Sequence, residues 1–163
     1  MSPIKLSILL LSFALCSCSF KPVHAKLDSG LANTLASVQV SDIRGREGQL
    51  LKYKLTDLLS PDSSSAYPNY RLDIELVTNR EDLGIQENLR ITRYNIVQTA
   101  NYKLVALQNN QIADEGAIKV KSSYNRTESE FATFVAEEDS SEKAAEELAQ
   151  LVKQRLTAYF AKY

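Results

Sequence analysis

Apolar residues alternate with polar residues over several stretches of the chain, and this pattern predicts β-strands. The clearest stretch is 70–76, in which every second residue is apolar. Weaker alternation predicts a first strand over 37–43, and residues 118–124 alternate again with Lys119 and Lys121 on the polar side. The pattern is typical of a sheet with one buried face and one hydrated face.

A longer extended stretch covers residues 89–107, and the position of its apolar residues shifts along it. They are odd-numbered at the start and even-numbered from Tyr94 onward. We expect a β-bulge near residues 92–93 to produce this shift. The asparagine pair at 109–110 is typical of a hairpin turn. The last three strands are therefore predicted to form an antiparallel meander.

Two segments show helical periodicity. Four leucines between 51 and 59 fall at spacings that gather them on one helical face, and Ser60-Pro61 ends this helix. A second helix is predicted to start at Asp139, with Glu142 completing a capping box. Its apolar stripe consists of Ala145, Leu148, Ala149, Val152, Leu156, Tyr159 and Phe160.

The order of these elements predicts an α+β fold. We expect a two-layer sandwich, in which a small, mostly antiparallel sheet of about four strands carries two helices on one face. Five residues are predicted to form the centre of the core between sheet and helices: Leu72, Ile74, Val120, Leu148 and Val152.

The N-terminus indicates export. Lys5 precedes an apolar run of about ten residues, which suits a signal peptide and is too short for a membrane-spanning helix. The run ends in Leu15-Cys16-Ser17-Cys18, which resembles a bacterial lipobox with Cys18 as the acylated residue. Cys16 does not fit the same pattern, because the bulky Leu15 precedes it. An ordinary secretory signal, cleaved for instance after Ala25, is the alternative.

This assignment divides the chain into three parts: a lipoprotein signal peptide (1–17), a lipidated tether (18–36) and a single α+β domain (37–163). Acyl chains on Cys18 and on its α-amino group would anchor the mature protein to a membrane without spanning it. Ser19 follows the acylated residue in place of the aspartate that typically retains lipoproteins in the inner membrane. We therefore expect a bacterial outer-membrane lipoprotein.

Composition and residue types argue against several function classes. The formal net charge of −1 does not favour nucleic-acid binding. The single histidine, His24, lies in the predicted tether without other metal ligands nearby, and no glycine-rich phosphate loop is present. Adjacent carboxylates such as Glu137-Glu138 suit a solvated surface better than a catalytic pair. We expect no enzymatic activity, no cofactor and no metal.

One surface feature suggests a binding role. Arg90, Arg93, Lys119 and Lys121 occupy polar strand positions, and neighbouring strands could bring them into a basic strip. Such a strip suits phosphorylated lipid headgroups. The alternative is that these residues form only the solvent side of half-buried strands.

From Cys18 onward, the chain resembles the lipopolysaccharide-assembly lipoprotein family of the LptE type. The resemblance rests on the lipobox with residues 19–22 behind it, on the strand and helix within 38–59, and on residues 129–139 leading into the helix at 144–156. It implies helices packed on a small mixed sheet. It also implies a partner, an outer-membrane β-barrel of the LptD type, which the protein would help to receive and insert lipopolysaccharide.

The basic lipid-contact residues of that family have no clear counterpart in this chain. Acids predominate near 82–89 and at Glu137-Glu138, where such residues are expected. The resemblance thus implies direct lipopolysaccharide binding less strongly than partnership with a barrel. The lipoprotein would lie in the lumen of that barrel or face the periplasm. The alternative function is a periplasm-facing auxiliary lipoprotein of a lipid or ABC-type transport system.

Overall fold

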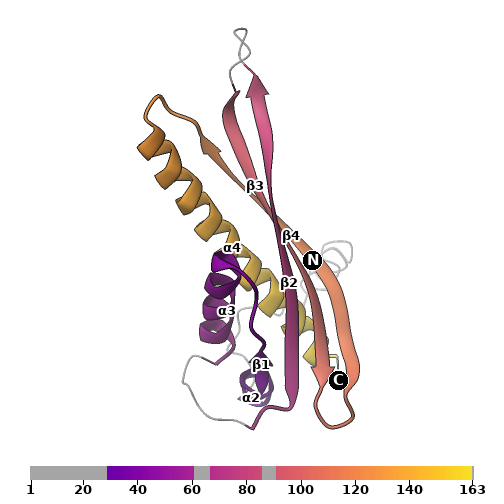
Figure 1. Ribbon diagram of the computed structural model, residues 1–163. Coiled ribbons are helices and arrows are strands. Elements are labelled where there is room, and N and C mark those ends of the chain that lie inside the picture. Colours follow the sequence, from indigo (N-terminus) through magenta and orange to yellow (C-terminus); the bar gives the residue numbers. More distant parts are fainter. Residues whose placement is uncertain (1–28, 61–66, 86–90, 163) are drawn as a thin grey trace, which may run out of the picture.

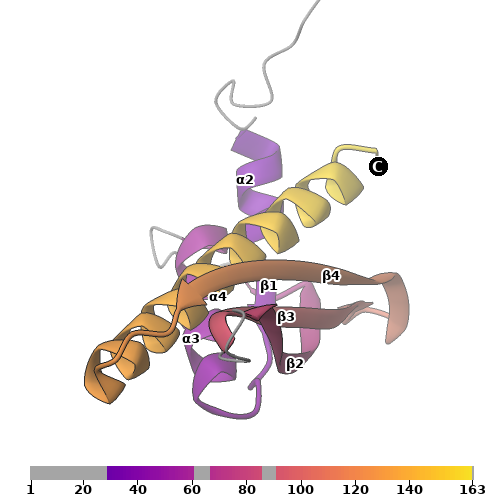
Figure 2. The same ribbon diagram turned by 90° about the horizontal axis from the view of Figure 1, so that it is seen from above.

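The computed structural model describes residues 29–60, 67–85 and 91–162. Their elements follow in the order α2 (Ser29–Ala36), β1 (Val38–Val40), α3 (Arg46–Leu59), β2 (Tyr70–Ile85), β3 (Ile91–Ala106), β4 (Gln111–Asn125) and α4 (Glu130–Phe160). Long strands form one layer, and α3 and α4 lie together on one of its faces (Figures 1 and 2). The predicted α+β two-layer sandwich is confirmed.

The sheet has four strands in the order β1-β2-β3-β4. The predicted meander is confirmed, since β2, β3 and β4 pair antiparallel. β1 instead runs parallel to β2, with Val38 opposite Tyr70. A parallel neighbour requires a crossover connection, and α3 provides it between β1 and β2.

The bulge predicted near residues 92–93 is wrong. The register between β2 and β3 is unbroken through the pairs Leu83–Arg93 and Ile85–Ile91. The irregularity lies at the other end of β3, between Leu104 and Val105. Residues 94–98 of this central strand are all buried, on both faces of the sheet. Apolar residues in such a segment do not have to alternate with polar ones, so a shift in their positions does not indicate a change of register.

The helices extend beyond the predicted limits at their N-terminal ends. α4 starts at Glu130, where the Ser129 side chain accepts a hydrogen bond from the Ala132 backbone N–H at 3.3 Å. α2 covers the last eight residues of the predicted tether, and its Leu35 is buried in the core. Residues 29–36 thus belong to the folded part of the chain, and residues 18–28 lie outside the described residues.

The main core lies between the sheet and all three helices. The five predicted core residues are all buried in it, which confirms that prediction. A second, smaller apolar cluster joins Tyr94, Ile96 and Tyr124 near the start of α4. Among the described residues, no helix combines the length and the hydropathy needed to cross a membrane.

A polar layer separates these two clusters. On the sheet it contains Gln98 and Ser122, and on α4 it contains Ser140 and Ser141. The Ser140 Oγ donates a hydrogen bond to the Ser122 Oγ at 2.9 Å, and the Gln98 side-chain amide donates to the Ser141 Oγ at 3.2 Å. Hydrogen bonds between helix and sheet thus replace apolar packing at this level.

Candidate interaction surfaces

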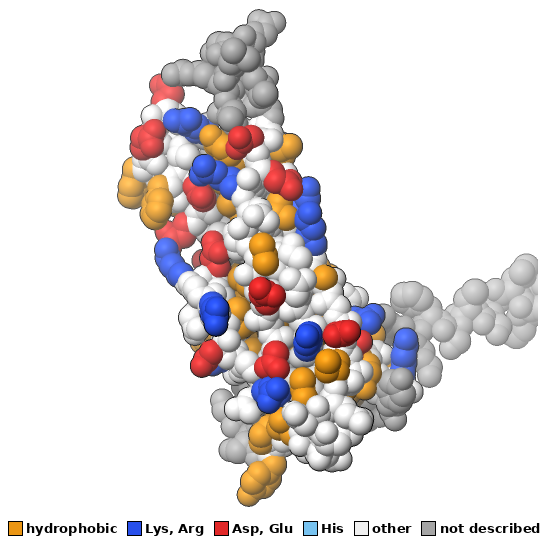
Figure 3. Space-filling model, turned by 45° about the vertical axis from the view of Figure 1, so that its right-hand side comes forward, with side chains coloured by type: hydrophobic (Ala, Val, Ile, Leu, Met, Phe, Trp, Pro, Cys, Tyr) orange, Lys and Arg blue, Asp and Glu red, His pale blue; other side chains and the backbone are white. Residues whose placement is uncertain are grey.

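The face of the sheet opposite the helices, here called the open face, carries the predicted basic residues. Lys119 and Lys121 are exposed neighbours on β4, and Arg93 is exposed farther along the same face of β3. Arg90 lies outside the described residues. Figure 3 shows Lys and Arg side chains mixed with Asp and Glu over the side of the molecule that it displays.

A carboxylate lies within the predicted strip. The Lys121 Nζ pairs with the Glu81 carboxylate at 3.0 Å, from β4 across β3 to β2. The hydrogen bond from Lys121 lowers the pKa of Glu81, and the charges of Lys121 and Lys119 act in the same direction. Beneath this pair, Val97 is only 2% exposed. The structure therefore brings Lys119 and Lys121 together, but it adds a negative charge to the strip.

A shallow hollow of about 690 Å³ lies near the lower end of the sheet and is lined in part by Asp42, Asp73 and Glu115. Asp42 and Asp73 have local partners. The Lys52 Nζ lies 2.5 Å from the Asp42 carboxylate and lowers its pKa. Asp73 accepts a hydrogen bond from the Ser41 hydroxyl. These contacts give Asp42 and Asp73 a structural role in this hollow.

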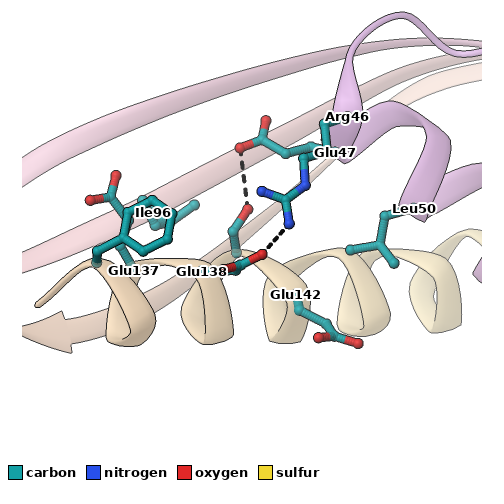
Figure 4. A pocket seen from close by; sticks show the side chains of 9 residues that line it. Arg46, Glu47, Leu50, Ile96, Glu137, Glu138 and Glu142 are labelled. Carbon is teal, nitrogen blue, oxygen red and sulfur yellow. Dashed lines mark hydrogen bonds and ion pairs between the residues drawn. The ribbon is translucent and has the colours of Figure 1, made fainter. Parts of the chain in front are cut away.

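A second cavity, the α3–α4 groove, opens between the starts of the two long helices. It has a volume of about 510 Å³. Its lining comprises Arg46, Glu47, Leu50, Ile96, Phe134, Glu137, Glu138, Ser141 and Glu142. In Figure 4, the side chains of α3 and α4 approach one another across this space, while Ile96 comes from the sheet.

The groove has an apolar base and an acidic rim. Four of its lining residues are glutamates and one is an arginine. Arg46 pairs with Glu138, and Glu142 pairs with Lys54 at 3.3 Å. The Ser141 hydroxyl donates to the Glu47 carboxylate at 3.3 Å, as the dashed lines of Figure 4 also mark. Cations on the protein thus offset only part of the negative charge.

An exposed apolar patch lies next to the groove on the first turns of α4. Phe131, Phe134 and Val135 are 77%, 59% and 47% exposed. Their spacing of three and four residues places them on one side of the helix. Sequence reasoning missed this patch, although that spacing was visible. An exposed group of large apolar side chains is typical of a surface that contacts a partner.

A polar cluster near the other end of α4, in which Tyr102 is buried and Arg155 is exposed, connects this helix to the sheet. The Tyr102 hydroxyl donates to the Asp114 carboxylate at 2.9 Å, and the Arg155 Nε donates to the Tyr102 oxygen at the same distance. Burial raises the pKa of Tyr102. Each group has a partner within the fold, so the cluster stabilises the packing of α4 on β3 and β4.

Groups of three or more metal-binding side chains are absent from the described residues.

The comparison with known sequences finds one relative of similar length. The chain is 29% identical over 155 residues to an uncharacterized protein of Rickettsia prowazekii, and the alignment covers 95% of this chain and 96% of that protein. No protein-family model matches the chain.

The comparison with solved structures identifies the fold. A candidate lipoprotein from Caulobacter crescentus aligns with a TM-score of 0.68 and 24% identity, covering 83% of this chain and 98% of that one. Rare lipoprotein B from Shewanella oneidensis aligns with a TM-score of 0.58 and 13% identity, covering 77% of this chain and 95% of that one. The chain therefore has the fold of these lipoproteins, as the resemblance to the LptE type predicts.

Proposed function

We propose that the protein is an outer-membrane lipoprotein, anchored through Cys18, that partners a large β-barrel of the LptD type in the assembly and insertion of lipopolysaccharide. One observation carries the proposal: a lipobox-like sequence precedes a domain with the fold of solved lipoproteins. The role is that of a binding partner and not of a catalyst.

The open face supports a role in contacting phosphate groups or the barrel. Lys119 is exposed beside Lys121, and both lie on a sheet face that no described helix covers. Because Lys121 is paired with Glu81, Lys119 and Arg93 contribute most of the available positive charge. We propose this part of the open face as the surface that meets lipopolysaccharide or the barrel wall.

Affinity purification of the tagged full-length protein from detergent-solubilised outer membranes tests the partnership. We expect a large β-barrel protein to co-purify in stoichiometric amount. Recovery of transporter subunits in its place would support the auxiliary role in a transport system. Recovery of neither class would contradict both functions.

Charge reversal tests the open face. Lys119→Glu should weaken lipopolysaccharide binding or barrel recovery, because it places a carboxylate beside Glu81. Lys103→Glu is the matched control, since Lys103 is exposed on the same face near the other end of β3. Two outcomes would mean that this end of the face is only solvated. In the first, Lys119→Glu and Lys103→Glu have equal effects. In the second, neither Lys119→Glu nor the Lys119→Glu/Lys121→Glu double variant has an effect.

A further inference from the structure

The upper edge of β2 has no strand beside it among the described residues. β1 pairs with β2 only over Tyr70–Leu72, whereas β2 continues to Ile85. In Figure 1, β2 and β3 extend well above the end of β1. An unpaired edge presents backbone N–H and C=O groups that another extended chain can bond.

The hydrogen bonds of the sheet identify which backbone groups lie on this edge. The Ser41 N–H donates to the Leu72 carbonyl, so Leu72 directs its backbone groups toward the β1 side. Alternate residues of a strand share this direction. The free edge therefore presents the backbone groups of Leu76, Thr78, Arg80 and Asp82.

The α3–α4 groove lies beside the same stretch of edge. Arg80, on the edge, pairs with Glu137 of the groove at 3.8 Å, and its guanidinium lies 5.0 Å from the centre of the Tyr94 ring. A strand added to β2 would direct every second side chain toward the helices. Those side chains would meet the apolar part of the groove lining, which comprises Leu50, Ile96 and Phe134.

The charges around the edge favour a cationic occupant. Glu137 and Glu138 lie on the helix side of the edge, in the rim of the groove. On the open face, Glu75 and Glu81 belong to β2 itself. On the helix side, Arg80 and Arg46 already pair with Glu137 and Glu138. On the open face, Lys121 pairs with Glu81, whereas Glu75 has no ion pair among the described residues. If the apolar residues of an added strand face the helices, its alternate side chains face the open face, where a Lys or Arg would complement Glu75.

Two buried oxygen atoms near this edge lack a hydrogen-bond partner among the described residues. They are the Thr78 Oγ1 and the Gln98 Oε1, and these two residues lie opposite each other in the β2–β3 pair. Gln98 is completely buried. Unpaired buried oxygens are costly, and a donor brought by a ligand would satisfy them.

We propose that the free edge of β2 and the α3–α4 groove together bind an extended segment of a partner protein, in which apolar residues alternate with Lys or Arg. The segment adds a strand above β1, places its apolar side chains against the groove and directs its cations to the open face, where Glu75 lies. This peptide site is independent of the lipopolysaccharide role, and a peptide alone is sufficient to test it.

Peptide binding tests the chemistry of the occupant. The probe is a fluorescent peptide of alternating lysine and valine, added to the purified full-length protein and measured by fluorescence anisotropy. We expect saturable binding. A peptide of alternating glutamate and valine, and a lysine–valine peptide with N-methylated central residues, should each bind at least about tenfold more weakly, which corresponds to ~1.4 kcal/mol. Equal affinity of the N-methylated peptide would overturn the added strand.

Amide exchange on the unmodified protein locates the site. Without peptide, the amides of Leu76, Thr78, Arg80 and Asp82 should exchange rapidly with solvent, because they face the free edge. With the lysine–valine peptide, their exchange measured by NMR should slow at least about tenfold, while the outward amide of Ala117 on β4 stays unchanged. Slowing at Ala117 alone, or at neither edge, would contradict the proposal.

A matched pair of proline variants tests the same edge. Thr78→Pro removes an edge N–H that does not pair with β3, and Ala117→Pro removes the corresponding outward N–H on β4. Thr78→Pro should weaken peptide binding at least about tenfold, and Ala117→Pro should leave it unchanged. The reverse result would assign binding to β4. Circular dichroism shows whether each variant folds. If Thr78→Pro does not fold, the exchange experiment on the unmodified protein decides whether the peptide binds at the β2 edge.

Discussion

Tyr102 of β3 lies directly opposite Gly116 of β4, and its hydroxyl oxygen is 3.1 Å from the position that a Cβ atom would take at residue 116. Hydrogen bonds to Asp114 and Arg155 hold the hydroxyl in place. A Cβ atom at residue 116 would therefore force the ring to shift by a few tenths of an ångström against those hydrogen bonds.

This relationship predicts a cost for any side chain at position 116. Gly116→Val should lower the free energy of unfolding by about 1–3 kcal/mol, because the added methyl groups displace Tyr102. Ala117→Val is the control, since Ala117 is exposed on the same strand, and it should change stability by no more than ~0.5 kcal/mol. Urea denaturation measures both. Equal stability of the two variants would show that the ring can move freely.

The apolar stripe of α4 predicts a second difference in stability. Leu148 is fully buried in the main core, so Leu148→Ala should destabilise the protein by about 2–5 kcal/mol. Phe131→Ala removes a larger side chain from the same helix, but at an exposed position, and should cost no more than ~0.5 kcal/mol. Thermal and urea unfolding distinguish the two. A large loss with Phe131→Ala would indicate that this ring packs within the protein in solution.

The pairing across the open face predicts how Glu81 titrates. Its pKa lies below the usual value of 4.5 chiefly because Lys121 donates a hydrogen bond to the carboxylate. The favourable contact is present at neutral pH and is lost as the pH falls through the lowered pKa. Lys121→Gln should therefore raise the pKa of Glu81 more than Lys119→Gln does, since Lys119 acts only through its charge. Carboxyl NMR titration measures each shift, and a larger effect of Lys119→Gln would contradict the observed pairing.

The lipobox predicts different outcomes for the two cysteines. Cys18→Ala should block acylation and leave an unprocessed precursor, whereas Cys16→Ala should be processed normally because this residue leaves with the signal peptide. Mass spectrometry of the mature N-terminus decides between them. A mature chain that begins before residue 18, or that lacks acyl mass, would remove the lipoprotein assignment.

Local sequence patterns predict most of this fold. Alternation over 70–76 identifies β2, and the stripe through Leu148 and Val152 identifies the part of α4 that covers the sheet. Both signals arise because one face is buried and the other is hydrated. The start of α4 escapes prediction for the same reason: residues 130–138 extend beyond the main core and carry exposed phenylalanines, so they lack a clear buried stripe.

The candidate surfaces are less predictable than the fold. Alternation places Lys119 and Lys121 on one polar face, but it gives no information about Glu81, whose approach depends on the register of three strands. The α3–α4 groove depends on how two helices distant in the sequence lie on the sheet. Its residues, such as Glu47 and Glu138, form ordinary helix surfaces when each helix is considered separately.

The position of α4 at the end of the described chain has a consequence for biogenesis. The meander has one apolar face, and α4 covers its β3 and β4 part through Ala144, Leu148, Val152 and Leu156. Until those residues are synthesised, β3 and β4 lack the helix that covers their apolar face, and the main core is incomplete. A growing chain therefore remains without its full tertiary structure until the α4 residues are synthesised, a state suited to the export that the lipobox-like sequence predicts.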